Sequence, residues 1–169
     1  KPKPAPQYFL ELFPEGGDLV QGVPSRLAFK ATDNRGWPVA VSADLVNGKG
    51  AKLESIRSTH NGMGFLHLNP VKGESYKISW KDPSGKLQQV AVPPAKPDGI
   101  VLELNHTEGG IQFNIKRRET ESAPLPAVQV IAQTQQQMIY RAKVNLTKSA
   151  LVSAVIPTEG VPAGIVQVT

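Results

Sequence analysis

The sequence predicts an all-β protein made of antiparallel sandwiches, and three observations lead to this prediction. Apolar residues alternate with polar ones in many short runs, which is the period of a half-buried strand. Glycine and proline, 15 of each among 169 residues, gather between those runs. No window of helical length keeps apolar residues at a 3.6-residue period without an interrupting glycine or proline or a competing alternation. Short strands with turns about ten residues apart are typical of an antiparallel sandwich.

The first half of the chain contains about seven such runs. Leu27 and Phe29 point to one side of their strand, and Tyr76, Ile78 and Trp80 share one side of theirs. We therefore expect these five side chains in the core of a first sandwich. The expected strands lie at residues 8–12, 26–31, 39–46, 52–59, 65–68, 76–81 and 86–92.

Two further features of this half are predicted. Leu53 is the main apolar residue of its strand, and Ile56, which is out of phase with it, indicates a bulge or a change of register. Asn47-Gly48-Lys49-Gly50 has the composition of a hairpin turn. In His60-Asn61-Gly62-Met63-Gly64 the glycines let the backbone bend, and the flexible Met63 side chain is expected to fill a gap in the core.

A proline-rich segment, Pro93-Pro94-Ala95-Lys96-Pro97, interrupts the strand pattern. Three prolines in five residues remove backbone donors and stiffen the chain, so we place a domain boundary here. The predicted organisation is an extended linker at 1–7, a sandwich at 8–93, a proline-rich linker at 94–98 and a second sandwich at 99–169. The alternative is a proline-rich loop inside one domain.

The second half contains about six more alternating runs. The last of them reaches Thr169, so we expect the second sandwich to be incomplete in this sequence and the chain to belong to a longer protein. The runs lie near residues 100–105, 111–116, 128–131, 138–144, 150–156 and 165–169.

Composition excludes several kinds of function. The chain has no cysteine, so disulfides, thiolate metal sites and a cysteine nucleophile are excluded. Its net charge of +5 is spread along the sequence, and the basic run Lys116-Arg117-Arg118 is followed by acidic residues. Aromatic residues do not interleave with the basic ones, so no nucleic-acid partner is expected. No apolar run has membrane-spanning length, and we expect no signal peptide within this sequence.

Residues that could carry chemistry do not form a known pattern. His60, His67 and His106 lack the spacing of a metal site. No G-x-S-x-G elbow is present, and the glycine-rich stretches lack the following helix of a phosphate loop. Carboxylate pairs such as Asp33/Asp44 and Glu119/Glu121 could serve in acid–base catalysis only in a cleft that raises the pKa of one of the two carboxyl groups. We expect no catalytic residue, no metal and no cofactor.

Trp37 is the best candidate for a contact residue. It stands between Gly36 and Pro38, where a loop would leave it partly exposed. Trp37, Trp80, Tyr8 and Tyr76 could in principle form a platform for a sugar, but Tyr76 and Trp80 have the parity of core residues.

Four stretches of the first half resemble the macroglobulin-like domains of the alpha-2-macroglobulin superfamily. They are Phe13-Pro14-Glu15-Gly16-Gly17-Asp18-Leu19-Val20, Arg26-Leu27-Ala28-Phe29-Lys30-Ala31, Thr59-His60-Asn61-Gly62-Met63-Gly64, and Asn69-Pro70 before Tyr76. In the second half, Val161-Pro162-Ala163-Gly164-Ile165 is similar to a phrase of the domain that follows in such proteins. The likeness is closer to large exported bacterial proteins linked to TonB-dependent outer-membrane receptors.

The resemblance implies two immunoglobulin-like, fibronectin-III-like sandwiches in tandem. It implies non-catalytic spacer or protein-interaction modules of a larger cell-envelope protein, in the periplasm or at the outer-membrane surface. The partner would be an envelope protein, and the membrane would be near through the parent protein rather than by direct insertion. The Cys-Gly-Glu-Gln thioester motif is absent, so thioester chemistry is excluded. The alternatives are a carbohydrate- or peptide-binding module, an enzyme fragment, and a sheet edge that accepts a partner strand.

Overall fold

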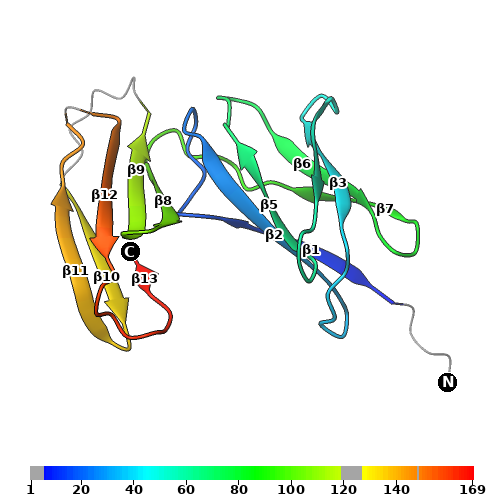
Figure 1. Ribbon diagram of the computed structural model, residues 1–169. Helices are drawn as coiled ribbons and strands as arrows, with labels where there is room; N and C mark the ends of the chain where they lie inside the picture. The colour runs from blue at the N-terminus through cyan, green and yellow to red at the C-terminus, as the bar shows by residue number, and fades with distance from the viewer. Residues whose placement is uncertain (1–5, 119–126, 148) are drawn as a thin grey trace. The chain divides into compact units, whose positions relative to one another are not determined.

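The computed structural model describes residues 6–118, 127–147 and 149–169. Within these ranges every regular element is a strand, and all the paired strands are antiparallel (Figure 1). The all-β prediction is therefore confirmed. The chain divides into two compact units, Lys1–Pro97 and Asp98–Thr169. None of the described residues forms a helix that is long and apolar enough to cross a membrane.

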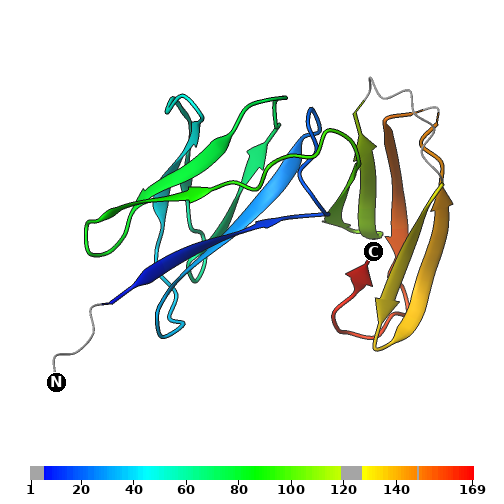
Figure 2. The ribbon, with the colours of Figure 1, turned by 180° about the vertical axis from the view of Figure 1, so that it is seen from behind.

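The first unit is a sandwich of a three-stranded and a four-stranded sheet. The three-stranded sheet has the order β1-β2-β5, and the four-stranded sheet has the order β4-β3-β6-β7 (Figures 1 and 2). Strands far apart in sequence pair in each sheet, as in the Greek-key topology of immunoglobulin-like sandwiches. The strands are β1 (Tyr8–Pro14), β2 (Ser25–Asp33), β3 (Ser42–Asn47), β4 (Lys52–Arg57), β5 (Met63–Leu68), β6 (Tyr76–Lys81) and β7 (Leu87–Ala91).

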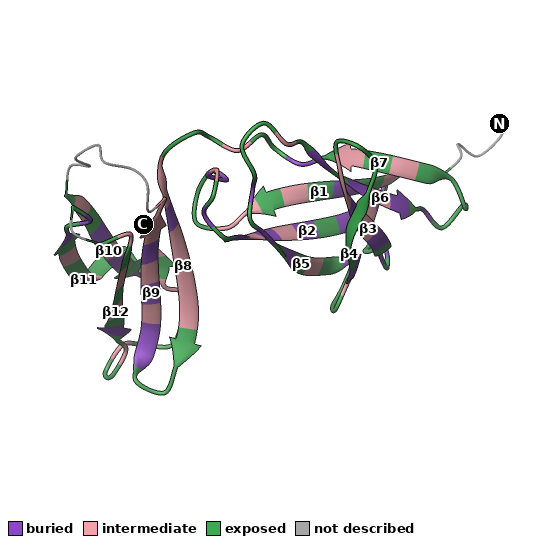
Figure 3. Ribbon diagram, turned by 90° about the horizontal axis from the view of Figure 1, so that it is seen from above, coloured by how far each residue is buried: buried purple, intermediate pink, exposed green. Residues whose placement is uncertain are grey.

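Alternate side chains of both sheets fill the space between them. Along β2 and β6, every second residue is buried, as the colours in Figure 3 indicate. Leu27, Phe29, Tyr76, Ile78 and Trp80 all belong to this core, which confirms the expected period-two burial. Their apolar area is the main source of stability for a chain without cross-links.

The bulge that Ile56 indicates is present in β4, but the prediction that Leu53 is the main apolar residue of this strand was wrong. Val46 pairs with Lys52 and Leu45 pairs with Glu54, so Leu53 is an extra residue in β4 and bulges out of the ladder. Its side chain is 51% exposed, whereas Ile56 is buried. A bulge shifts the inward parity of a strand by one residue, and Ile56 is therefore the apolar anchor of β4.

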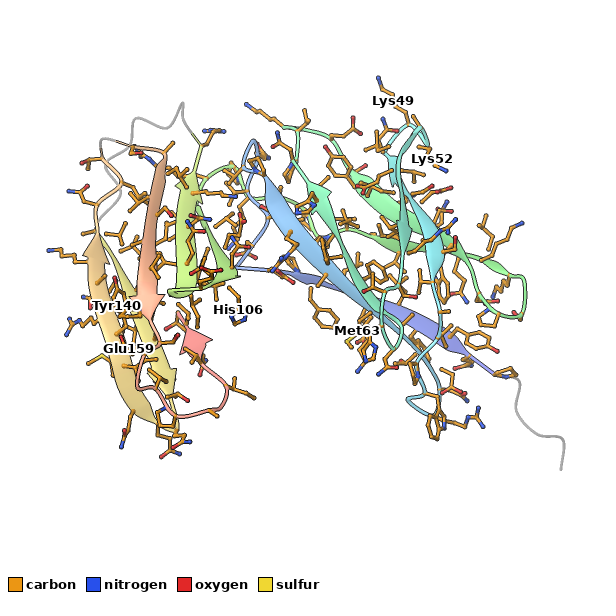
Figure 4. The ribbon with its side chains drawn as sticks, in the orientation of Figure 1. Lys49, Lys52, Met63, His106, Tyr140 and Glu159 are labelled. Atoms are coloured by element: carbon orange, nitrogen blue, oxygen red, sulfur yellow. The ribbon has the colours of Figure 1, made fainter. Side chains whose placement is uncertain are left out.

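The prediction that Met63 fills a core gap was also wrong. Met63 is exposed at the start of β5 and its side chain lies on the outward side of its sheet (Figure 4). The inward position is Gly64, where an added Cβ would lie 2.5 Å from Cζ of Phe29. The Phe29 ring already occupies the space beneath this bend, so a methionine side chain is not needed there.

The proline-rich segment makes backbone hydrogen bonds to the β1–β2 connection. The Lys96 amide donates to the Leu19 carbonyl at 2.7 Å, and the Gln21 amide donates to the Lys96 carbonyl at 2.9 Å. The Lys96 ammonium also lies 2.5 Å from the Asp18 carboxylate. Lys96, at the centre of the expected linker 94–98, is thus held by the first unit.

The second unit contains two three-stranded sheets with the orders β12-β9-β8 and β11-β10-β13. Ile111, Phe113, Ile115, Val130 and Ile156 are buried between them. β13 pairs with β10 opposite Ala132 and Gln133. The strands are β8 (Ile100–Thr107), β9 (Gly110–Arg117), β10 (Val128–Thr134), β11 (Gln137–Val144), β12 (Leu151–Pro157) and β13 (Gln167–Val168).

Candidate functional site

Trp37 lies on the surface, in the loop that follows β2. Its side chain is 65% exposed, while its backbone is fixed by Asp33. One carboxylate oxygen of Asp33, Oδ1, accepts the amides of Arg35 at 2.8 Å and Trp37 at 3.0 Å, and the Asp33 amide donates to the Trp37 carbonyl at 2.9 Å. The sequence-predicted contact residue is thus presented to solvent by an ordered turn.

The carboxylate pair Asp33/Asp44 is not set up for acid–base chemistry. Burial works to raise the pKa of Asp33, but the amides of Arg35 and Trp37 and the Arg35 guanidinium outweigh it and hold this pKa below its ordinary value. Hydrogen bonds from Lys52 and Ser55 lower the pKa of Asp44. Both groups are ionised at neutral pH, and neither is an available proton donor. The pair Glu119/Glu121 lies outside the described residues.

The histidines have separate surroundings. Within the first unit, His60 contacts the Asn61 amide in the β4–β5 turn, and the His67 ring meets the Phe65 ring edge to face at 5.6 Å. His106 belongs to β8 of the second unit (Figure 4). Among the residues that the structure describes, no three His, Cys, Asp or Glu side chains converge to hold a metal ion.

The outward side of the β1-β2-β5 sheet carries a set of exposed apolar side chains, which we call the aromatic face. Its members are Phe9, Phe13, Met63 and Phe65, each between 42% and 49% exposed. Phe13 pairs with Ala28, and Ala28 pairs with Phe65 on the other side of β2. Two phenylalanines therefore stand on either side of a small residue.

Charged pairs flank the row of Phe13, Ala28 and Phe65 on both sides. Arg26 forms an ion pair with Glu15, and its guanidinium carbon lies 5.3 Å from the centroid of the Phe65 ring. One step along the sheet, Glu11 pairs with Lys30 across β1 and β2. The cation–π contact and the edge-to-face contact with His67 hold the Phe65 ring in place at the surface.

A shallow cavity of about 390 Å³ lies at one end of the first sandwich. Leu45, Leu68 and Tyr76 form its buried floor, and the bulged Leu53 and exposed Val71 stand at its rim. The Tyr76 hydroxyl is already engaged, because it accepts the Val71 amide at 3.0 Å. The cavity is a recess between strand ends with an apolar floor.

No known protein family and no curated protein sequence matches the chain. Among solved structures, the chain is similar to the crystal structure of Salmonella alpha-2-macroglobulin reacted with methylamine. The alignment covers 92% of this chain and 13% of that one, with 16% identity and a TM-score of 0.34. The chain thus spans about an eighth of that protein's length. The sandwich architecture itself rests on the strand pairing and burial described above.

The aromatic face was missed by sequence reasoning, although a signal was present. Phe9, Glu11 and Phe13 share the parity opposite to the buried Leu10. On a half-buried strand, a phenylalanine two residues from a glutamate lies on the same side of the strand as the glutamate. Its side chain is therefore expected to point outward. The neighbouring position of Phe65 follows only from the pairing of β5 with β2.

Proposed function

We propose that the chain consists of two non-catalytic β-sandwich modules, which act as spacers and bind a protein partner. The aromatic face of the first sandwich is the observation that carries this proposal. On this face a row of exposed aromatic side chains, Phe13 and Phe65, is flanked by charged pairs. Exposed apolar side chains flanked by charges are characteristic of protein–protein contact surfaces. A flat sheet face suits a large partner better than a small molecule, which prefers a concave site.

The state of the polar side chains supports a non-catalytic role. Asp33, Asp44 and Asp82 have lowered pKa values because each carboxylate is engaged by local hydrogen bonds. Catalytic acids and bases more often have pKa values moved toward neutrality. Asp33 and Asp82 fix turns, and Asp44 links β3 to Ser55 and Lys52 of β4. We therefore assign structural roles to these three carboxylates.

The sequence resemblance to macroglobulin-like domains suggests the setting. We propose that the parent protein is exported by a bacterium and lies in the cell envelope, in the periplasm or at the outer-membrane surface. Its partner would be an envelope protein, and a link to TonB-dependent uptake is the finer form of this proposal.

The test is photo-crosslinking in bacteria that produce the full parent protein. A photoreactive amino acid at position 13 is expected to give a protein adduct in the envelope fraction. The same amino acid at position 89, an exposed site on β7 of the other sheet, is the control and should give none. Equal adducts at both positions, no adduct from position 13, or a cytoplasmic parent protein would contradict the proposal.

The exposure of Trp37 favours one second candidate, a carbohydrate-binding module. Exposed indoles stack on sugar rings, and the Asp33 turn fixes the backbone beneath this one. A glycan array would show binding that Trp37→Ala abolishes and Phe13→Ser leaves unchanged. Absence of glycan binding by the unaltered chain would remove this candidate.

A further inference from the structure

We infer that the partner of the aromatic face is a second copy of this chain. The two copies would pack face to face about a twofold axis that runs parallel to β1 and β2 and passes between them. This inference rests on the proposed function, because it names the partner of the same surface. It is carried by the order of side chains across the sheet, where β2 lies between β1 and β5 (Figure 1).

Charge is divided between neighbouring strands on this face. The outward positions on β1 and just after it are aromatic or acidic, and those on β2 are small, polar or basic. The pairs across the two strands are Phe9 with Thr32, Glu11 with Lys30, Phe13 with Ala28, and Glu15 with Arg26. One column of the face is therefore acidic and the adjacent column is basic.

A twofold axis between these columns places each residue of β1 over the β2 residue that is its own cross-strand partner. Glu11 of one copy then lies over Lys30 of the other, and Glu15 lies over Arg26. Symmetry repeats both contacts, so each charge meets the opposite sign. An axis along β2 would instead stack Lys30 on Lys30, and an axis across the strands at Phe13 would stack Glu11 on Glu15. Charge complementarity thus selects one arrangement.

Shape favours the same arrangement. Ala28 leaves a gap between Phe13 on β1 and Phe65 on β5. Neighbouring strands are about 4.8 Å apart, so β1 and β5 lie about 9.6 Å apart on either side of β2. In the proposed dimer Phe13 of the second copy enters this gap and touches the methyl group of Ala28. Phe65, held by Arg26, forms the far wall of the gap. Sheets that pack face to face interdigitate side chains in this way at a separation of about 10 Å.

The size of the contact sets its expected strength. The overlap covers only two strands of one sheet, so we expect it to bury less than the roughly 800 Å² per partner of a standard interface. We therefore expect a weak dimer, with a dissociation constant on the order of 100 µM at low salt. Because the rows on both sides of Phe13 and Ala28 are charged, the association should weaken at about 0.5 M salt.

The test uses sedimentation equilibrium of the chain up to about 1 mM at low salt. Glu11→Lys and Lys30→Glu each place like charges across the axis, and each should weaken self-association at least tenfold. An equimolar mixture of the two variants should associate again, because each charge then meets the opposite sign on the other copy. Lys77→Glu, on the exposed side of β6, is the matched control and should leave the dissociation constant unchanged.

The mixture separates a dimer contact from an effect on folding. Each variant has like charges at positions 11 and 30 within its own sheet, and mixing does not change this. Mixing restores only the favourable contacts between copies. Ala28→Phe, which fills the gap and alters no charge, should also abolish association. A second sample of each variant, monitored by circular dichroism, verifies that the sheets are formed.

Two results would overturn the inference. The first is an unaltered chain that stays monomeric at about 1 mM and low salt. The second is a mixture of the charge variants that associates no better than either alone. If position 13 nevertheless gives an adduct with a different protein in cells, the proposed interaction role stands and only the partner is wrong. If position 13 gives no adduct and the chain is monomeric, both fail.

Discussion

Gly62 occupies a backbone position that no other residue can share without distortion. Its φ is +73°, and an added Cβ would lie 2.5 Å from the Ala31 carbonyl oxygen and 2.8 Å from that of Val39. The Gly62 carbonyl also accepts the Ala31 amide at 2.9 Å, so the turn cannot move away freely. The glycine is required both for the left-handed conformation and for the close approach of β2 and the segment before β3.

We expect Gly62→Ala to destabilise the first sandwich by more than about 3 kcal/mol. Gly36→Ala is the control, because Gly36 has a φ of +84° but open space around it. It should cost only about 1–2 kcal/mol, which is the price of the left-handed conformation alone. Urea unfolding of both variants measures the difference. Equal losses of unfolding free energy would show that the Ala31 and Val39 carbonyl groups move aside without an energetic cost.

Asp82 gives the first sandwich an acid-sensitive turn. Its Oδ1 accepts the Ser84 hydroxyl at 2.5 Å and the backbone amides of Ser84 and Lys86, and its Oδ2 accepts the side-chain Nε2 of Gln88 at 2.6 Å. The hydrogen bond from the Ser84 side chain is the main cause of the lowered pKa of Asp82, and burial opposes it. The ionised carboxylate is thus favoured by the folded state.

The sign of the pH effect follows from this lowered pKa. The stabilisation is fully present above the unfolded-state pKa of about 3.9 and is lost as pH falls through the folded-state pKa. We expect Asp82→Asn to lower the melting temperature at neutral pH and to flatten its decline below about pH 4. Thermal melts from about pH 2.5 to 7 measure both effects. An unchanged slope below pH 4 would show that other carboxylates control the acid response.

At the scale of elements, the hairpin of β10 and β11 has a strained connection. Gln135 and Gln136 have φ values of +48° and +64°, the type I′ geometry that favours Asn-Gly. The double change Gln135→Asn and Gln136→Gly should therefore stabilise the second unit by about 1 kcal/mol. Denaturant unfolding followed by circular dichroism checks this, and a loss of stability would mean that a glutamine side chain contributes more than the strain costs.

The bulge in β4 leaves Leu53 exposed and Ile56 buried, whereas the sequence predicts Leu53 as the main apolar residue of the strand. Ile56 is 4% exposed and Leu53 is 51% exposed. Ile56→Ala should cost about 2–4 kcal/mol, because it opens a cavity in the core. Leu53→Ala should cost less than about 1 kcal/mol. Urea unfolding measures the free energy of unfolding that each variant loses, and the ratio of the two losses tests the position of the bulge. Comparable losses would place the bulge elsewhere in β4.

These elements mark what could be predicted from the sequence. Leu27, Phe29, Ile78 and Trp80 were assigned to the core because alternation is local information. Leu53 was misjudged because one extra residue inverts the parity of a strand, and the neighbouring strand determines where that residue is accommodated.

The same limit applies to the candidate site. The exposure of Trp37 follows from its own neighbours, glycine and proline, in a loop. The aromatic face depends on the pairing of Phe13 with Ala28 and of Ala28 with Phe65. Such cross-strand neighbours are set by long-range register, which a single sequence does not specify.

At the scale of the whole molecule, the two units differ in how many buried side chains their cores contain. Among the described residues, 16 hydrophobic side chains form the buried cluster of the first unit and 8 form that of the second. The chain has no cysteine to cross-link either unit. Because buried apolar area supplies most of the stability of a small domain, we expect the second unit to unfold at a lower urea concentration.

The positions of the tryptophans make this difference measurable in the intact chain. Both tryptophans, Trp37 and Trp80, belong to the first unit, and Trp80 is buried in its core. Tryptophan fluorescence therefore follows the first unit alone, while far-ultraviolet circular dichroism follows the strands of both. During urea unfolding, the circular dichroism signal should begin to change before the fluorescence does. Coincident transitions would mean that the chain unfolds as one cooperative body. The second unit would then be stabilised by more than the side chains of its own core.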